Sequence, residues 1–499
     1  MDLNNFKKFL IQNKEIIILL SIFIFLYSFH LDKFPNVWTD EAWFINPAYA
    51  LVTLGKLGTT MKVGAIANYT YWQPPVFFLL LAASFKLFGF GLIQARMVSV
   101  ALGFLTVLFT YLLGKNLYSK NVGLLASLLL ISNPLFFYIC RQSRMDIAVV
   151  CFTLIALYFI YIALKESKPF YYFVSSLFAM ISILSHPNGL LGLVAIILII
   201  LVYKVDFKGL KLNLKFKEII SFIFGIILPL IPYLIYISYD FPEFKNQFNS
   251  NIGSSTSNLL TNLITEPSRY ILLLSFLNNI EGILLKFMIV TGVILTICGL
   301  YYILKDRSFK EKFLIIILLT HITLFALIVA NKLNYWYLGI ILPYWMILIL
   351  LPFKNINLFS NNGLKLNFLK ILLIIFLFVN FMGIYHMIPI SSNYNYLEIE
   401  YEVQKYIPEG SVVVGEPAYW IALTNKYTYY DHYGPNITNY DDWKVQYILY
   451  DYYWNNSDLN SSSAISIKNF IKQNTTLVGI IPYSPNLGLG PIKVYKVNK

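Results

Sequence analysis

The chain alternates long apolar stretches with short polar connections from its N-terminal end to about residue 390. A hydrocarbon core of about 30 Å requires about 20 apolar residues per helix, and roughly eleven stretches approach that length. They lie at residues 15–31, 93–114, 121–139, 147–164, 170–185, 189–203, 218–239, 282–304, 313–331, 337–353 and 366–389. The pattern predicts an α-helical polytopic membrane domain.

Basic residues gather in alternate connections between these stretches. The clusters are Lys115 and Lys120; Lys165 and Lys168; Lys204, Lys208, Lys211, Lys215 and Lys217; Lys305, Arg307, Lys310 and Lys312; Lys354 and Lys365. Cytoplasmic connections are enriched in lysine and arginine. We therefore expect a multi-pass protein of the cell membrane with a cytoplasmic N-terminus and an extracytoplasmic C-terminal tail. Glycosylation-type sequons at Asn68, Asn436, Asn455, Asn460 and Asn474 fall in segments that this topology places outside.

One apolar segment does not fit this alternation. Residues 75–88, PVFFLLLAASFKLF, would span only about 21 Å as a helix. Counting the segment as a crossing would invert every later basic connection. We expect it to be a helix in the outer interface or a shallow re-entrant helix.

The character of the sequence changes near residue 390. Segments such as LEIEYEVQKYI have helical spacing, whereas SVVVGE, VQYILYDYY and PIKVYKV are typical of strands. This change predicts a membrane domain over residues 1–390 followed by a small extracytoplasmic α/β domain over residues 391–499.

Composition supports the membrane class. The 499 residues are 58% hydrophobic and 13% charged, against about 25% charged in soluble domains. The net charge of +13 does not indicate nucleic acid as a partner, because the basic residues lie between apolar runs.

The three cysteines, Cys140, Cys151 and Cys298, have no ligand-like spacing. The sequence therefore predicts neither a disulfide framework nor a zinc site. The first stretch lacks a small-residue cleavage site, and we expect it to remain as a span.

An acidic pair, Asp40-Glu41, follows the first apolar stretch. A carboxylate at the membrane interface has a raised proton affinity and interacts strongly with nearby cations, which suits a general base. The alternative is an ordinary outward loop whose acids have no catalytic role.

A second polar group, RQSRMD at residues 141–146, follows the stretch that ends PLFFYIC. Arg141 and Arg144 would share a face if the helix continued, and would then offer a fork of donors to a phosphate. Asp146 adds a third outward carboxylate. The alternative is that these arginines anchor a helix end at the interface.

Five further residues are candidates on the same side: Lys62, Arg96, His186, Lys332 and Tyr335. Arg96 lies near the start of an apolar helix and must find a carboxylate or phosphate partner. His186 precedes Pro-Asn-Gly, where a histidine is more often a turn residue bonded to the main chain. Two interpretations of Lys332 stay open: it pairs with a lipid phosphate, or it is an interfacial anchor in an aromatic belt beside Tyr335.

No Gly-rich phosphate loop, HExxH, GxSxG or Walker sequence is present, so nucleotide hydrolysis and serine-triad chemistry have no visible carrier. A sugar nucleotide would also be on the wrong side of the membrane, because the candidate residues are expected outside. A sugar donor carried on a lipid is the natural alternative.

Taken in order, the acidic pair, the Arg96 helix, GKNLYSKNVG, SNPLFFYICRQSRMD, SHPNGLLGL and NKLNYWYLGIILPYW resemble the GT-C glycosyltransferases of the protein mannosyltransferase and aminoarabinose transferase superfamily. The similarity covers roughly residues 15–390, and the tail around YIPEGSVVVGE looks like the appended domains of prokaryotic members.

The resemblance implies transfer of a sugar from a polyprenyl-phosphate or dolichyl-phosphate carrier to an outer acceptor, with inversion. Asp40 matches the family's base on the acceptor hydroxyl, with Glu41 beside it, and Asp146 matches the second acidic position. The arginines, Arg141, Arg144 or Arg96, match groups that hold the lipid phosphate. Base and phosphate-binding groups on opposite faces are what inversion requires.

Two family features are missing. The WWDYG signature of oligosaccharyltransferases is absent, and residues 240–281 are too short for the β-trefoil of eukaryotic protein mannosyltransferases. The acceptor therefore stays open between a protein hydroxyl, a glycan and a lipid head group. Asp40, Glu41 and Asp146 offer oxygen ligands for a divalent cation, but arginines make one unnecessary, and we expect no cofactor.

Two other functions compete with this one. A transporter or flippase would also have many spans, but should carry charges near the bilayer centre and a repeat between its halves. A surface protein whose helices only anchor an outer domain would not need so many of them.

Overall fold

A computed structural model provides the structure of the protein. It describes residues 11–61, 69–206, 211–252, 259–277, 282–306, 308–329, 334–354, 364–388, 396, 398–431, 444–451, 462–482 and 491–498. Two site candidates, Lys62 and Lys332, lie outside the described residues, as do the sequons at Asn68, Asn436, Asn455 and Asn460.

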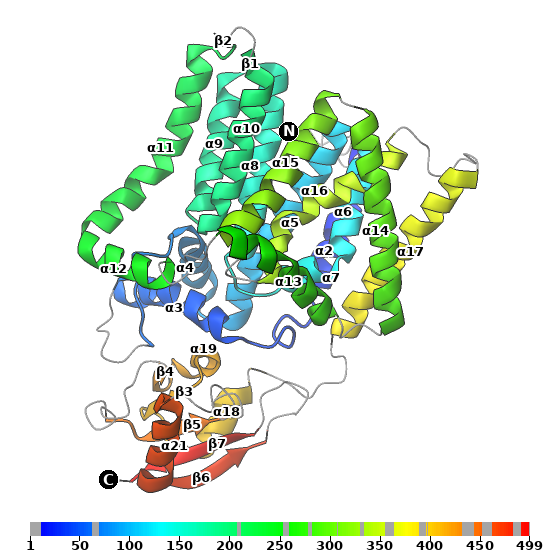
Figure 1. The fold of residues 1–499 in the computed structure, drawn as a ribbon. Coiled ribbons are helices and arrows are strands. Elements are labelled where there is room, and N and C mark those ends of the chain that lie inside the picture. The colour runs from blue at the N-terminus through cyan, green and yellow to red at the C-terminus, as the bar shows by residue number, and fades with distance from the viewer. Residues whose placement is uncertain are drawn as a thin grey trace.

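The apolar stretches form a bundle of helices (Figure 1). Its elements are α2 (Lys14–Ser28), α5 (Leu92–Leu117), α6 (Lys120–Ser132), α7 (Pro134–Cys140), α8 (Asp146–Glu166), α9 (Pro169–Ile183), η1 (Pro187–Gly189), α10 (Leu190–Lys204), α11 (Phe216–Ser238), α14 (Gly282–Lys305), α15 (Phe309–Leu324), η3 (Phe325–Val329), η4 (Tyr335–Ile340), α16 (Leu342–Leu348), η5 (Leu351–Phe353) and α17 (Leu364–Met387). Within the described residues, six helices are long and apolar enough to cross a membrane, or seven if α6 and α7 form one span. The chain is a multi-pass membrane protein.

Two of the expected spans are not straight helices. The stretch at 121–139 bends by 72° between α6 and α7. Pro134 begins α7, and the side chain of Asn133 caps it by accepting from the Phe136 N–H at 3.0 Å. The stretch at 337–353 is divided into η4, α16 and η5, and Pro343 and Pro352 lie at the starts of the last two. Proline at these positions cannot donate to the preceding turn, which explains the breaks.

Four further helices lie at one end of the bundle (Figure 1). They are α3 (Thr39–Leu54), α4 (Val76–Phe88), α12 (Phe241–Ile252) and α13 (Leu259–Leu277). The segment expected at 75–88 is helix α4, which packs against α3 and α5. The short strands β1 (Val205–Asp206) and β2 (Lys211–Leu212) lie at the opposite end of the bundle.

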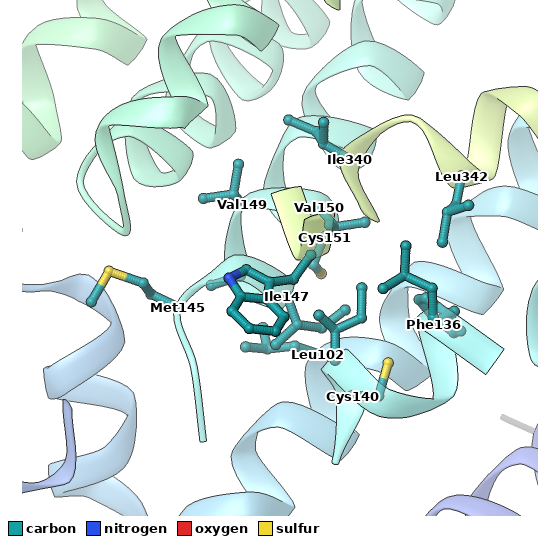
Figure 2. Packing of buried hydrophobic residues seen from close by; sticks show 14 of the residues in the cluster. Leu102, Phe136, Cys140, Met145, Ile147, Val149, Val150, Cys151, Ile340 and Leu342 are labelled. Atoms are coloured by element: carbon teal, nitrogen blue, oxygen red, sulfur yellow. The ribbon is translucent and has the colours of Figure 1, made fainter. Parts of the chain in front are cut away.

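The core of the bundle is centred on α8, which is buried along most of its length. Figure 2 shows its residues Ile147, Val150 and Cys151 near Leu102 of α5, Phe136 and Cys140 of α7, and the segment that carries Ile340 and Leu342. Helices α9 and α11 also pack closely, because Gly225 of α11 lies against α9. A Cβ at Gly225 would come within 2.4 Å of the Phe173 carbonyl oxygen.

Below the bundle lies the predicted α/β domain (Figure 1). Its elements are α18 (Glu398–Gln404), β3 (Val412–Gly415), η6 (Pro417–Tyr419), α19 (Trp420–Leu423), β4 (Thr428–Asp431), β5 (Tyr447–Tyr450), α21 (Ser462–Asn474), β6 (Thr475–Ile481) and β7 (Ile492–Val497). The strand order is β4-β3-β5-β7-β6; β3 is parallel to β4 and β5, whereas β7 is antiparallel to β5 and β6. The boundary expected at residues 390/391 lies outside the described residues.

Candidate active site

Helix α3 presents the acidic pair. The helix begins at Thr39, so Asp40 and Glu41 lie in its first turn, where the helix dipole favours negative charge. Successive residues of a helix are rotated by about 100°. The two carboxylates therefore point to different surroundings, and the structure gives each a separate arginine partner.

Glu41 is enclosed in the protein. Its carboxylate accepts two bonds from Arg96, from Nη2 at 2.6 Å and from Nε at 3.0 Å. The Ser143 N–H donates to it at 2.8 Å. Arg96 completes the arrangement by donating to the Leu31 carbonyl oxygen at 2.8 Å. Both side chains are 0% exposed, so this bidentate pair joins α3 to α5 without access to a ligand.

Asp40, by contrast, is open. Its side chain is 37% exposed, and one oxygen, Oδ2, accepts from Arg144 Nη1 at 2.6 Å. Arg144 Nε in turn donates to Asp146 Oδ2 at 2.9 Å. Arg144 thus bridges the two carboxylates that the sequence placed on this side, and no hydrogen bond within the described residues engages its Nη2.

Aromatic rings enclose the Arg144 guanidinium. Its centre lies 4.9 Å from the ring of Trp38, 5.4 Å from Phe44 and 5.0 Å from Trp336. Burial by itself would lower the pKa of Arg144, but Asp146 and Asp40 outweigh that effect and raise the pKa above its ordinary value. Arg144 is consequently a fixed positive charge.

Arg141 does not join Arg144 in a fork, because α7 ends at Cys140. Its guanidinium instead lies against the C-terminal end of α2. All of its N–H groups donate to main-chain carbonyl oxygens, those of Leu26, Tyr27, His30 and Phe34, at 2.8–3.3 Å. Arg141 thereby caps the last carbonyls of α2 and has no donor left for a phosphate.

Asp40, Arg144 and Asp146 line one cavity of about 640 Å³. His186 lines it too; its Nδ1 accepts from the Asn188 N–H at 3.2 Å, so the ring is bonded to the main chain at the start of η1. Tyr337 and Asn334 contribute from η4 and the residue before it. The cavity therefore gathers candidates from three separate polar connections.

Further lining residues of the cavity come from α12 and the segment before α4. They include Glu243, Gln247, Trp72 and Gln73. Gln247 fixes this part of the lining, because its side chain accepts from the Tyr71 N–H at 2.9 Å and donates to Glu243 at 2.8 Å. Sequence reasoning missed these residues; the signal available was a run of acid and amide residues directly after a span.

An aromatic layer lies beside the cavity. Trp336 packs on Trp38 with ring centres 5.2 Å apart and on Tyr335 at 4.4 Å, and Tyr335 stacks on Phe276 at 4.8 Å. Tyr335 was a sequence candidate, whereas Trp38 and Trp336 were not, although Trp38 directly precedes the helix of the acidic pair. A second, apolar cavity of about 290 Å³ is lined by α7, α13, α14, α16 and α17 residues such as Leu277, Gly292 and Trp345.

A metal ion has no evident set of ligands in the described part of the chain, where no group of three His, Cys, Asp or Glu side chains is arranged to hold one. Asp40 and Asp146 both face Arg144, and Glu41 faces Arg96. Cationic charge at this site is supplied by arginine.

The fold and part of the sequence match known proteins. Over 97% of this chain and 98% of the other, the structure is similar to ArnT from Cupriavidus metallidurans bound to undecaprenyl phosphate, with a TM-score of 0.67 and 13% identity. It is also similar to the archaeal oligosaccharyltransferase AglB from Archaeoglobus fulgidus in complex with an inhibitory peptide and a dolichol-phosphate, with a TM-score of 0.56 and 14% identity over 96% of this chain and 74% of the other.

A family model described as dolichyl-phosphate-mannose-protein mannosyltransferase matches residues 72–236. An uncharacterized protein of Aquifex aeolicus (strain VF5) is 25% identical over 181 residues, which are 36% of this chain and 35% of that protein. The match thus spans about a third of the length of that relative. The chain is a membrane protein with a GT-C glycosyltransferase fold of the protein mannosyltransferase and ArnT type, as the sequence predicted.

Proposed function

We propose that this protein transfers a sugar from a polyprenyl-phosphate or dolichyl-phosphate donor to a hydroxyl acceptor, with inversion and with Asp40 as the general base. One observation carries the proposal: Asp40 is the member of the acidic pair that reaches the cavity, partly exposed and held by Arg144 through one oxygen. The second oxygen, Oδ1, is the one available for an acceptor hydroxyl, and a base must lie within hydrogen-bond reach of the proton it removes.

The chemistry follows from this arrangement. The acceptor oxygen forms a bond to the anomeric carbon while the bond from that carbon to the phosphate oxygen breaks. The hydroxyl proton moves to Asp40, and the carrier leaves as a polyprenyl phosphate with its added negative charge. Arg144 is the described arginine that lines the cavity, and in this proposal its Nη2 stabilises that charge.

Arg96 and Arg141, two other phosphate candidates, support the site from outside it in this proposal. Their donors are engaged by Glu41 and by main-chain carbonyls, so they place α3, α5 and the end of α2. Asp146 holds Arg144 from the side opposite Asp40.

We also propose that the cavity opens on the extracytoplasmic side. The basic segment around β1 and β2 lies at the end of the bundle opposite α3, α12 and the C-terminal domain (Figure 1). Because basic connections stay in the cytoplasm, this separation supports a cytoplasmic N-terminus and an outer C-terminal domain.

The test is consumption of synthetic polyprenyl-phosphate sugars by purified protein, comparing wild type with Asp40→Asn and with Asp32→Asn as the matched control. Asp32 is a carboxylate of the same connection that is not among the cavity-lining residues. We expect wild type and Asp32→Asn to release polyprenyl phosphate and Asp40→Asn to be slower by about 10²–10⁴-fold. Equal rates for wild type and Asp40→Asn would exclude Asp40 as the base, and net movement of intact donor across a vesicle would favour a transporter.

A further inference from the structure

Three carboxyl groups meet at one edge of the C-terminal sheet. Strands β3, β4 and β5 are parallel, and Glu416, Asp431 and Asp451 lie at or directly after their carboxyl ends. The ends of parallel strands share an edge, which is the usual position for functional groups in such sheets. The three side chains belong to residues that are 2%, 0% and 2% exposed. The sheet edge is thus a buried, acidic surface.

The membrane domain covers this edge through the start of α3. Thr39 Oγ1 donates to Glu416 Oε1, and the Asp431 N–H donates to the Met61 carbonyl oxygen at 2.9 Å. Trp420 of α19 is 1% exposed, and its ring lies edge-on to Tyr49 of α3 at 5.3 Å. Thr39 directly precedes Asp40 in the chain, so the contact with Glu416 is made by the residue next to the proposed catalytic residue.

We propose that Glu416 is a positioning residue for the transfer reaction, which in its neutral form fixes the start of α3, and with it Asp40, against the C-terminal domain. This inference rests on the proposed function of Asp40. Asp431 and Asp451 disfavour a charged Glu416, whereas a protonated Glu416 removes that repulsion and still accepts from Thr39.

Within the described part of the chain, several neighbouring elements bring groups toward Glu416. These include Asp431 from β4, Asp451 after β5, Thr39 from α3 and the hydroxyls of Tyr419 and Tyr429. The tyrosines are neutral donors, to Asp451 at 2.6 Å and to the Glu416 carbonyl oxygen at 2.7 Å. Burial raises the pKa of Glu416 from 4.5 to about 7, and Asp451 and Asp431 contribute in the same direction.

Contact between the C-terminal domain and the start of α3, here called docking, depends on pH through Glu416. Between about pH 4.5 and 7, Glu416 keeps its proton in the docked state but has released it in the undocked state. Docking is therefore strongest at low pH and weakens as pH rises through that range, by about tenfold between pH 6 and 8. A general base requires the opposite trend, so Glu416 would supply the falling limb of a bell-shaped profile.

Glu416→Gln separates these effects, because glutamine retains an oxygen that accepts from Thr39 and cannot release a proton. Glu409→Gln is the matched control, an exposed carboxylate of the same domain that pairs with Lys426 at 3.0 Å. Thr39→Val removes the bond from the other partner and serves if Glu416→Gln does not fold.

Two readouts are measured on the full-length protein. Hydrogen exchange of main-chain amides over residues 420–431 reports docking without substrate, and kcat and KM against pH report transfer. We expect interface exchange in wild type and Glu409→Gln to accelerate between pH 6 and 8, after correction for intrinsic rates, and kcat to fall. Glu416→Gln should show neither change, and Thr39→Val should lower kcat at every pH with KM retained.

The outcomes are separable. Equal pH dependence of interface exchange in wild type and Glu416→Gln would overturn proton-linked docking. A difference in exchange without a difference in the kcat profile would overturn the positioning role. Absence of transfer by wild type with any donor would overturn the proposed function, while the exchange comparison alone still supports or overturns the docking.

Discussion

Asp40 and Glu41 are neighbours in the chain and each contacts an arginine, yet their surroundings are opposite. Glu41 and Arg96 are 0% exposed and fully engaged by each other, by Leu31 and by Ser143. Asp40 is 37% exposed and shares Arg144 with Asp146 at the wall of a cavity of about 640 Å³. The closed pair can stabilise the fold, whereas the open pair can meet a substrate.

The difference shows how one helical turn separates structure from chemistry. A buried ion pair costs desolvation energy and survives only with near-ideal geometry, which the bidentate Glu41 contact has. In the open pair, both Asp40 and Arg144 line the cavity. Adjacent acids therefore need not share a function, and the comparison can be tested from either side.

The largest stability effect is expected for Glu41→Ala. The change leaves Arg96 buried without its carboxylate and removes the acceptor of the Ser143 N–H. Breaking such a pair lowers the free energy of unfolding by about 3–5 kcal/mol. Thermal unfolding in detergent, followed by tryptophan fluorescence, measures this loss.

The control for that experiment is the double variant Glu41→Leu with Arg96→Leu, which removes both charges and should recover much of the lost stability. A Glu41→Ala protein that unfolds like wild type but has lost transfer would contradict the assignment, because it would place Glu41 in the chemistry.

The next effect is on activity. Arg144→Lys replaces a planar fork that bridges Asp40 and Asp146 by a single ammonium group. Since the lost nitrogen is the one proposed to meet the leaving phosphate, we expect kcat to fall by about 10²-fold or more. Steady-state release of polyprenyl phosphate measures it. An unchanged kcat together with a raised donor KM would restrict Arg144 to ground-state binding.

Much of the membrane domain could be predicted from sequence, because about 20 consecutive apolar residues have few alternatives to a spanning helix. The breaks at Asn133-Pro134 and around Pro343 were harder to place, since local proline effects compete with length. Helix α3 was missed, as TDEAWFINPAYALVTL has modest hydrophobicity and an internal proline, Pro47. Its packing on α4 and on the C-terminal domain forms it instead.

The sequence was sufficient to predict which polar connections form the site, but not which side chains within them contact one another. Asp40, Arg144, Asp146 and His186 do line one cavity. The sequence could not assign Arg96 to Glu41 or Arg141 to the end of α2, because those contacts depend on which side of each helix faces the core. Tertiary packing alone brings Glu243 to the cavity and the ring of Trp336 to Arg144.

Arg141→Lys examines a second closed arginine. Lysine cannot reproduce the planar set of donors that caps the carbonyls of Tyr27, His30 and Phe34. Losing hydrogen bonds to a charged group should lower the free energy of unfolding by about 1.5–3 kcal/mol. The same unfolding assay measures this, and kcat per folded protein should not change. A raised KM for the donor with unchanged stability would instead give Arg141 a role at the phosphate.

The smallest effect is expected at an ion pair on the surface. Lys120 and Glu15 lie 3.0 Å apart, and both side chains are 41% exposed. Water and salt screen such a pair, and holding two long side chains in one geometry has an entropic cost. Glu15→Gln should leave the unfolding midpoint unchanged within the error of the assay at both low and high salt. If Glu15→Gln instead destabilised the protein as much as Glu41→Ala, the loss of stability would depend on the ion pair itself and not on its burial. The contrast between Asp40 and Glu41 would then have to be explained by something other than burial.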